Sequence, residues 1–115
     1  MPPKKVDFNT VREIARALPG VEDGFTYGSP ALKVDGKLLA CIPTNKAAEP
    51  GSLAVRIDFD RRAELLETDP EVYYLKDHYV NYPAVLVRLS RIHPDALRGL
   101  LSDAWHFVTA KKKKR

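Results

Sequence analysis

Residues 31–42 read Ala-Leu-Lys-Val-Asp-Gly-Lys-Leu-Leu-Ala-Cys-Ile, and this stretch predicts a β-hairpin. Two largely apolar runs flank Asp35-Gly36, a pair suited to the type I′ turn because both central residues of that turn need positive φ. Side-chain alternation divides such a hairpin between two faces, and which of them is buried stays open because the polar alternation is imperfect. One face is expected to hold Leu32, Val34, Leu39 and Cys41, and the other Ala31, Lys33, Leu38, Ala40 and Ile42.

Three further segments have the pattern of strands. Residues 53–59 alternate between apolar and polar, which predicts a half-buried strand. The inward side chains are expected to be Leu53, Val55, Ile57 and Phe59, with Arg56 and Asp58 facing outward. Residues 84–89 are β-branched and apolar enough for an interior strand, and a short strand is expected around residues 24–27.

Helix patterns begin and end the chain. Thr10 and Glu13 have the spacing of a capping box, and Pro19-Gly20 ends the helix that follows. His93-Pro94-Asp95 opens the longest helix, since proline fits the first turn, and Asp60 is expected to cap a short helix between these two. The predicted buried stripes are Val11, Ile14, Ala15 and Leu18 in the first helix and Leu97, Leu100, Leu101, Ala104, Trp105 and Val108 in the last.

Strands clustered between helices indicate an α+β fold in two layers. We expect an antiparallel sheet of about five strands, with the N-terminal and C-terminal helices packed on one face. Residues 1–110 are predicted to form a single domain, and residues 111–115 a basic disordered tail. This tail holds five of the 19 Lys and Arg residues, so the basic character of the chain comes from its end and the rest is close to neutral.

The cysteine count and the hydropathy pattern bear on the cellular setting. Cys41 is the only cysteine, so the chain cannot form an internal disulfide, and we expect a reducing, cytoplasmic location. No apolar run approaches the roughly 20 residues that cross a bilayer, and the first residues lack a signal-peptide pattern. A cytoplasmic monomer without a membrane partner is the prediction.

Motifs that carry catalysis or hold cofactors are missing from the sequence. The six glycines never take the spacing of a phosphate-binding loop, and the three histidines are far from one another and from Cys41. Cys41 as a nucleophile with His78 as its base is a weaker reading than Cys41 as a small buried apolar residue. We therefore predict a protein that is not an enzyme, with no catalytic residue, no metal and no cofactor.

Basic and aromatic side chains suggest two binding functions instead. The first is DNA or other nucleic acid, held weakly and in a salt-sensitive way through phosphates, with tyrosine rings available to stack on bases. Its candidate residues are Lys33, Lys37, Lys76, His78, Tyr79, Arg88, Lys111, Lys112, Lys113, Lys114 and Arg115. The alternative is an adaptor that binds a protein or a small ligand with the surface of residues 73–82, where four tyrosines gather.

Four segments together resemble the MmcQ/YjbR family. They are residues 18–22 (Leu-Pro-Gly-Val-Glu), the 28–37 hairpin, residues 78–87 (His-Tyr-Val-Asn-Tyr-Pro-Ala-Val-Leu-Val) and the closing helix 97–105 with its lysine-rich end. The resemblance implies a small bacterial cytoplasmic protein with a frataxin-like α+β architecture, described as a double-wing DNA-binding fold. In that fold the hairpin around Asp35-Gly36 would serve as a wing. The resemblance to this family implies no catalytic residues.

Overall fold

One antiparallel sheet organises the part of the chain that the computed structural model describes, residues 6–26, 28–44 and 48–110. Its six strands are β1 (Val21–Thr26), β2 (Ser29–Val34), β3 (Lys37–Cys41), β4 (Ser52–Arg56), β5 (Tyr73–Tyr74) and β6 (Ala84–Arg88). Their order across the sheet is β1-β2-β3-β4-β6-β5. The sheet has one strand more than expected, because the aromatic segment supplies the short β5 at one edge.

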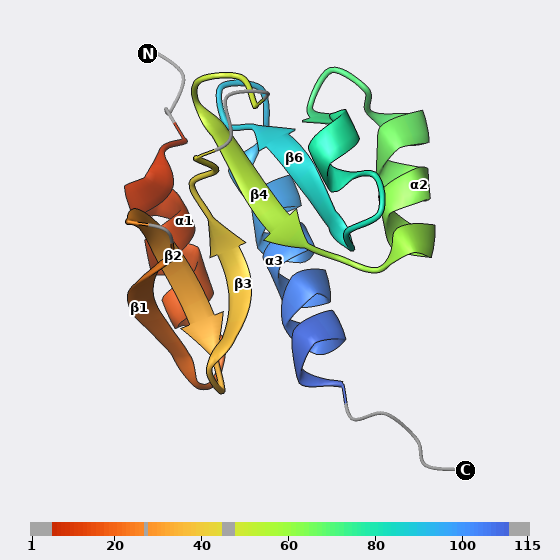
Figure 1. Ribbon diagram of the computed structural model, residues 1–115. Helices are drawn as coiled ribbons and strands as arrows, with labels where there is room; N and C mark the ends of the chain where they lie inside the picture. The colour runs from red at the N-terminus through yellow and green to blue at the C-terminus, as the bar shows by residue number, and fades with distance from the viewer. Residues whose placement is uncertain (1–5, 27, 45–47, 111–115) are drawn as a thin grey trace, which may run out of the picture.

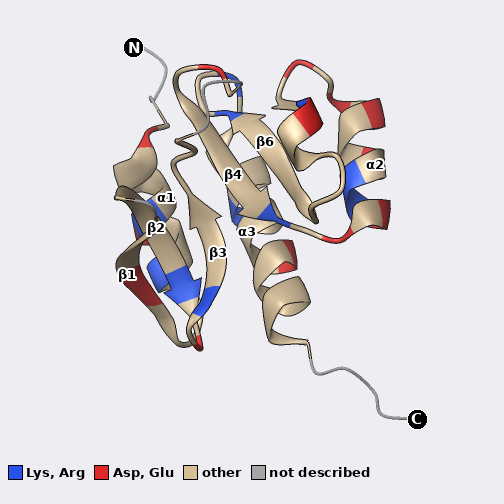
Figure 2. Ribbon diagram, in the orientation of Figure 1, with Lys and Arg blue, Asp and Glu red and all other residues tan. Residues whose placement is uncertain are grey.

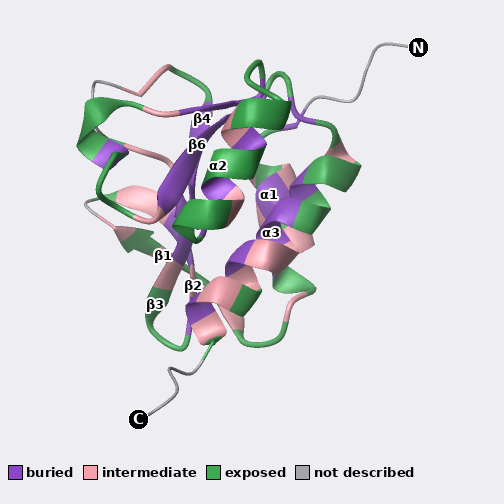
Figure 3. Cartoon of the chain, turned by 90° about the vertical axis from the view of Figure 1, so that its right-hand side faces the viewer, coloured by how far each residue is buried: buried purple, intermediate pink, exposed green. Residues whose placement is uncertain are grey.

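Two helices cover one face of this sheet, as Figures 1 and 3 show. They are α1 (Phe8–Arg16) and α3 (Pro94–Thr109), while α2 (Phe59–Thr68) lies beside β5 and β6. A single 3-10 turn, η1 (Asp77–Tyr79), follows β5. The predicted α+β class, with the terminal helices on one face of an antiparallel sheet, is confirmed.

Apolar side chains are buried on both faces of the sheet. The larger cluster fills the space between the sheet and the helices α1 and α3, and it includes most of the residues predicted for the two helical stripes. The smaller cluster lies on the opposite face, which we call the open face because no helix longer than η1 is packed against it among the described residues. It consists of Ala31, Cys41, Ala54, Tyr74, Tyr79, Ala84 and Leu86.

The predicted hairpin is confirmed, but its faces differ from the prediction. Asp35 and Gly36 have φ of 53° and 76°, as a type I′ turn requires. A β-bulge interrupts the ladder, since Lys33 pairs with Leu38 while Leu32 pairs with Ala40. The extra residue, Leu39, shifts the alternation by one position, so that Ala40 joins Leu32 in the main core and Cys41 turns to the open face.

Both helix starts in the N-terminal half lie earlier than predicted. The cap of α1 is Asp7, whose carboxylate accepts a hydrogen bond from the backbone N–H of Thr10 at 3.0 Å, so the capping box begins three residues before the expected one. Asp58 caps α2 in place of Asp60 by accepting from the N–H of Arg61 at 2.7 Å. In α3, His93 is the cap and Pro94 the first helical residue, as predicted.

The strand predicted over residues 53–59 is shorter in the structure. Leu53, Val55 and Ile57 are buried in the main core as expected. β4 ends at Arg56, however, because Asp58 begins α2, and this places Phe59 in the first turn of the helix with 47% of its surface exposed. The inward position predicted for Phe59 is therefore wrong.

Candidate functional site

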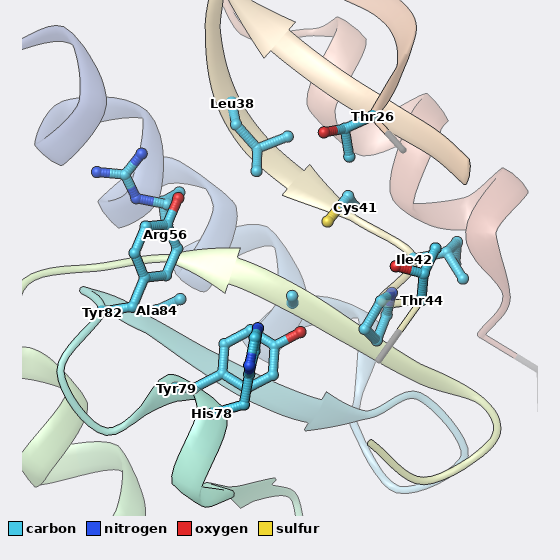
Figure 4. A pocket seen from close by; sticks show the side chains of 12 residues that line it. Thr26, Leu38, Cys41, Ile42, Thr44, Arg56, His78, Tyr79, Tyr82 and Ala84 are labelled. Atoms are coloured by element: carbon cyan, nitrogen blue, oxygen red, sulfur yellow. The ribbon is translucent and has the colours of Figure 1, made fainter. Parts of the chain in front are cut away.

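A pocket of about 490 Å³ is hollowed into the open face of the sheet (Figure 4). Small side chains form its floor: Cys41 pairs with Ala54 on the neighbouring strand, and Ala84 pairs with Arg56. Large side chains at these positions of the central strands would fill the space, so the hollow exists because the floor side chains are small. The lining residues are Thr26, Leu38, Cys41, Ile42, Pro43, Thr44, Ala54, Arg56, His78, Tyr79, Tyr82 and Ala84.

One wall of the pocket is the segment 78–84, and Arg62 of α2 holds it in place. The Arg62 guanidinium donates to the carbonyl oxygens of Tyr79, Val80 and Tyr82 at 2.9–3.0 Å and to that of Ala84 at 3.3 Å. Only 9% of its surface is exposed, and burial lowers its pKa from the ordinary value. The four hydrogen bonds from Arg62 therefore attach segment 78–84 to α2, although most of this segment lies outside helices and strands.

Burial shifts the pKa of two groups that face the cavity, the Tyr79 hydroxyl and the Cys41 thiol (Figure 4). Burial raises the pKa of Cys41, so the thiol is neutral and a poor nucleophile at neutral pH. Burial also raises the pKa of Tyr79, with Cys41 adding to the effect, so its hydroxyl keeps its proton and can donate a hydrogen bond. The pocket thus offers a buried donor on an apolar floor.

Arg56 gives the pocket a positive charge at its rim. Its guanidinium carbon lies 5.0 Å from the centre of the Tyr82 ring and 5.5 Å from that of Phe107, so the two aromatic rings hold it. Its Nε donates to the carbonyl oxygen of Pro83 at 3.3 Å. The alternation of residues 53–59 predicted only that Arg56 faces outward.

The nucleic-acid candidates from the sequence fall into separate places. His78 and Tyr79 line the pocket. Lys33 pairs with Leu38 on the open face, but Lys37 pairs with Val34, which is buried under the helices, so the two lysines of the hairpin point to opposite faces. Figure 2 shows basic residues near the end of this hairpin. The five tail candidates, residues 111–115, lie outside the described residues.

Lys76 and Arg88 come together over one tyrosine ring, away from the hairpin. The Lys76 ammonium is 5.9 Å and the Arg88 guanidinium 4.4 Å from the centre of the Tyr74 ring. Arg88 also donates through Nε and Nη2 to both carboxylate oxygens of Glu49, each at 2.9 Å, and this pairing lowers the pKa of Glu49. The charge of Arg88 is therefore largely neutralised within the fold.

These basic groups lie at opposite ends of the strands of the sheet. Arg88 pairs with Ser52 at the start of β4, whereas Lys37 lies beyond the last residue of β4, Arg56, because β3 runs antiparallel to it. Extended by this register, Lys37 lies opposite position 58, six residues from Ser52, so at about 3.3 Å per residue the backbones of Lys37 and Arg88 are roughly 20 Å apart along the strands. Among the described residues (6–26, 28–44 and 48–110), the predicted candidates do not form one continuous strip of free charge.

Sequence reasoning missed Arg56 and Arg62 as residues that build the site. An arginine on the polar side of an alternating strand, and another inside an amphipathic helix pattern, both look like ordinary solvated positions. The one available signal is that Arg62 lies where the helical period of Leu65 and Leu66 places the buried side of α2.

Two further features of the described residues concern metals and membranes. Nowhere in that part of the chain do three His, Cys, Asp or Glu side chains gather as they would around a metal ion. None of the described helices combines the length and the apolar character needed to span a bilayer.

Comparisons with known proteins point to one family. The chain is 38% identical over 66 residues to Uncharacterized protein Rv2570 of Mycobacterium tuberculosis and, to the same extent, to Uncharacterized protein Mb2600 of Mycobacterium bovis. The match takes in 54% of this chain, which spans about half the length (51%) of those curated relatives.

A solved structure shares the fold over the whole chain. The crystal structure of Deinococcus radiodurans protein DR2400, which has a DUF419 domain, superposes with a TM-score of 0.75 and 20% sequence identity, covering 100% of this chain and 87% of that one. The sequence model of the YjbR family matches residues 16–107, from the end of α1 through most of α3. The six-stranded sheet and the segments that line the pocket fall inside this match, and the chain belongs to the YjbR family, as its sequence suggests.

Proposed function

We propose that this chain binds a small organic ligand in the pocket on the open face of its sheet. The observation that carries the proposal is the hollow of about 490 Å³ over Ala54 and Ala84, which is mostly apolar and has few polar groups. Ligand pockets in proteins are typically 300–1,000 Å³ in volume and combine an apolar lining with a small number of placed polar side chains. The proposal gives the 73–82 segment a role in ligand binding, through His78, Tyr79 and Tyr82.

The fold supports this proposal because the pocket does not compete with the core. Val55 and Val85 point into the main core beneath α3, while their neighbours Ala54 and Ala84 point into the pocket. The helices therefore stabilise the sheet from one side, and the other side is free to hold a ligand. Arg62 fixes the wall, so much of the site exists before the ligand arrives.

A neutral apolar dye, N-phenyl-naphthylamine, tests the proposal. Its fluorescence rises on entering an apolar site, and we expect saturable binding to the full chain. Ala54→Trp should abolish the binding by filling the pocket, whereas Ala63→Trp, the same change at an exposed position of α2, should leave it intact. Circular dichroism and urea unfolding would show that both variants are folded.

Thr26→Phe is a second way to fill the pocket, from the edge strand β1, should Ala54→Trp fail to fold. Dye binding that is unchanged in a folded pocket-filling variant would exclude the pocket as the site. Absence of any saturable binding to the original chain would count against the proposal itself.

Nucleic-acid binding is the second candidate function, and one observation favours it. Lys33 and Lys37 lie at the end of the hairpin without an ion pair to any described residue, so their ammonium groups are available to phosphates. In this reading the hairpin acts as a wing, and the tail of residues 111–115 extends the footprint. Binding would be weak and largely independent of base sequence.

Fluorescence anisotropy of a labelled duplex at several salt concentrations tests this second candidate. Each phosphate contact contributes about 0.9 to the slope of log affinity against log salt. Lys33→Gln with Lys37→Gln, and separately the removal of residues 111–115, should each flatten the slope. A duplex at micromolar protein and low salt that shows no anisotropy change would remove nucleic acid as a partner.

A further inference from the structure

Arg56 differs from the other arginines in how its charge is satisfied. Six arginines lie 2.9–3.9 Å from a carboxylate oxygen: Arg12, Arg16, Arg61, Arg88, Arg91 and Arg98. Arg62 has its four carbonyl partners. Arg56 has neither an acidic partner nor a hydrogen bond from its terminal nitrogens within the described ranges, and it is the arginine of the pocket wall.

The surroundings of Arg56 hold the guanidinium without using its terminal nitrogens. The Tyr82 and Phe107 rings lie at 5.0 and 5.5 Å from its carbon atom, and Nε is bound to the Pro83 carbonyl oxygen. Aromatic rings this close to a guanidinium attract it and restrict its motion without accepting hydrogen bonds from its terminal nitrogens. The two terminal nitrogens are thus a positioned pair of donors with an unpaired positive charge.

Tyr79 supplies a second, independent sign of a ligand. Only 8% of its surface is exposed, and its hydroxyl has no hydrogen-bond partner among the residues that the structure describes. Every side-chain nitrogen or oxygen that is fully closed off in this part of the chain has a partner, so solvent reaches the Tyr79 hydroxyl through the pocket. Figure 4 shows the hydroxyl turned toward the cavity. A ligand in the pocket can take the place of solvent there and accept a hydrogen bond from this hydroxyl.

Building on the proposed ligand pocket, we propose that its ligand is a monocarboxylic acid with a flat apolar body. The body lies over Ala54 and Ala84, and the carboxylate is held by the terminal nitrogens of Arg56. The hydroxyl of Tyr79 donates to a polar atom of the ligand inside the cavity. This assigns Arg56 and Tyr79 as ligand-binding residues.

Charge and shape favour a carboxylate over a phosphate. The pocket lining holds one arginine and no lysine, which matches a single negative charge better than the double charge of a phosphate ester. The planar fork of a guanidinium fits the two oxygens of a carboxylate. The small side chains of the floor leave a flat surface suited to a ring or a short apolar chain.

Two naphthalene derivatives of nearly the same shape test the inference: naphthoate, which is an anion, and naphthamide, which is neutral. Each would displace the neutral dye from the full chain in a competition titration. We expect naphthoate to bind about 10- to 100-fold more tightly than naphthamide, since a hydrogen bond to a charged group is worth about 1.5–3 kcal/mol. Arg56→Gln should reduce this preference to near unity while naphthamide binding persists.

Matched variants separate the roles of the residues. Arg91→Gln removes an exposed arginine outside the pocket, so the preference for naphthoate should be unchanged. Tyr79→Phe keeps the ring and loses the hydroxyl, and it should weaken both compounds. Unfolding in urea would show that each variant is folded.

The outcomes distinguish this inference from the proposed function. Equal displacement of the dye by naphthoate and naphthamide would overturn the carboxylate inference and leave the pocket as a ligand site. A preference that survives in Arg56→Gln would overturn the role of Arg56. Failure of the dye and of both compounds to bind would overturn the proposed function together with the inference.

Discussion

The buried guanidinium of Arg62 provides the sharpest test of how the pocket wall is built. Arg62→Met keeps an unbranched side chain of similar length and removes all donors. The carbonyl oxygens of Tyr79 and Ala84 lie in buried surroundings and would lose this partner. Those of Val80 and Tyr82 are partly exposed, so water can replace the guanidinium there.

The expected loss of stability follows from these four contacts. The Tyr79 carbonyl oxygen still accepts from the backbone N–H of Tyr82 at 3.1 Å, so only that of Ala84 is left without a partner, which costs about 1–3 kcal/mol. Replacing a buried charge with an apolar side chain recovers part of the cost of desolvating that charge. We therefore expect Arg62→Met to lower the free energy of unfolding by about 1–3 kcal/mol, out of the roughly 5–15 kcal/mol typical of a domain.

Urea unfolding followed by circular dichroism measures this loss, and Arg61→Met is the matched control. Arg61 is the preceding residue and pairs at the surface with Glu64 and Asp103, at 3.0 and 3.1 Å. Exposed ion pairs contribute about 1 kcal/mol or less. An Arg62→Met variant that loses no more stability than Arg61→Met would refute the reasoning, and so would one that loses stability but binds the dye unchanged.

Three other perturbations have expected outcomes that urea unfolding can check. Gly36→Val should lower the free energy of unfolding by about 1–2 kcal/mol, because φ is 76° at this position. Gly99→Ala, in α3 with open space around it, should raise that free energy by about 1 kcal/mol. Equal effects of the two substitutions would contradict this view of the turn. Trp105→Phe removes the 2.8 Å hydrogen bond from Nε1 to the Pro19 carbonyl oxygen and should cost about 1 kcal/mol, and no loss would mean that this bond is unimportant. Burial raises the pKa of Cys41 in the folded chain, so the unfolded chain loses the thiol proton first and stability should fall as pH rises above 9.0. Cys41→Ala should make this fall of stability with pH shallower. An identical slope in the variant would refute the assignment.

Local signals in the sequence were enough to predict the class of fold. The Asp35-Gly36 turn depends on two backbone angles that few other residues adopt, and His93-Pro94 marks a helix start by geometry alone. The core stripe of α3 follows from its helical period, except that the predicted Trp105 is only partly buried. These features need no knowledge of neighbouring segments, and the structure has each of them.

The errors arose where the choice between two similar positions depends on tertiary contacts. Either Asp58 or Asp60 could cap α2, and the path of β4 selects Asp58. The bulge at Leu39 leaves no mark in the sequence, since both neighbours of that residue are apolar. Once the bulge forms, Cys41 changes face, and with it the identity of the pocket floor.

The candidate site could be predicted only in part for the same reason. The 73–82 segment stood out through its tyrosines, and Tyr79 does line the pocket. The other half of the site comes from β3 and β4, and the residues that matter there are small or look solvated. Cys41, Ala54 and Ala84 become a floor only when antiparallel pairing places them side by side.

The position of the hollow explains how a chain of 115 residues can keep a large pocket and still have a core. A sheet buried on both faces is normally covered by a layer on each side. Here α1 and α3 cover one face, and a short segment held by hydrogen bonds from Arg62 covers part of the other.

Substitutions on the pocket floor should therefore change stability independently of those in the core, because alternate residues of β4 face opposite layers. Ala54 and Val55 are neighbours with side chains on opposite faces, so the double variant Ala54→Trp, Val55→Ala tests this separation. Losses of stability in the two single variants that add to that of the double variant within about 0.5 kcal/mol support it. A large coupling between the two substitutions would mean that pocket and core share one packing unit.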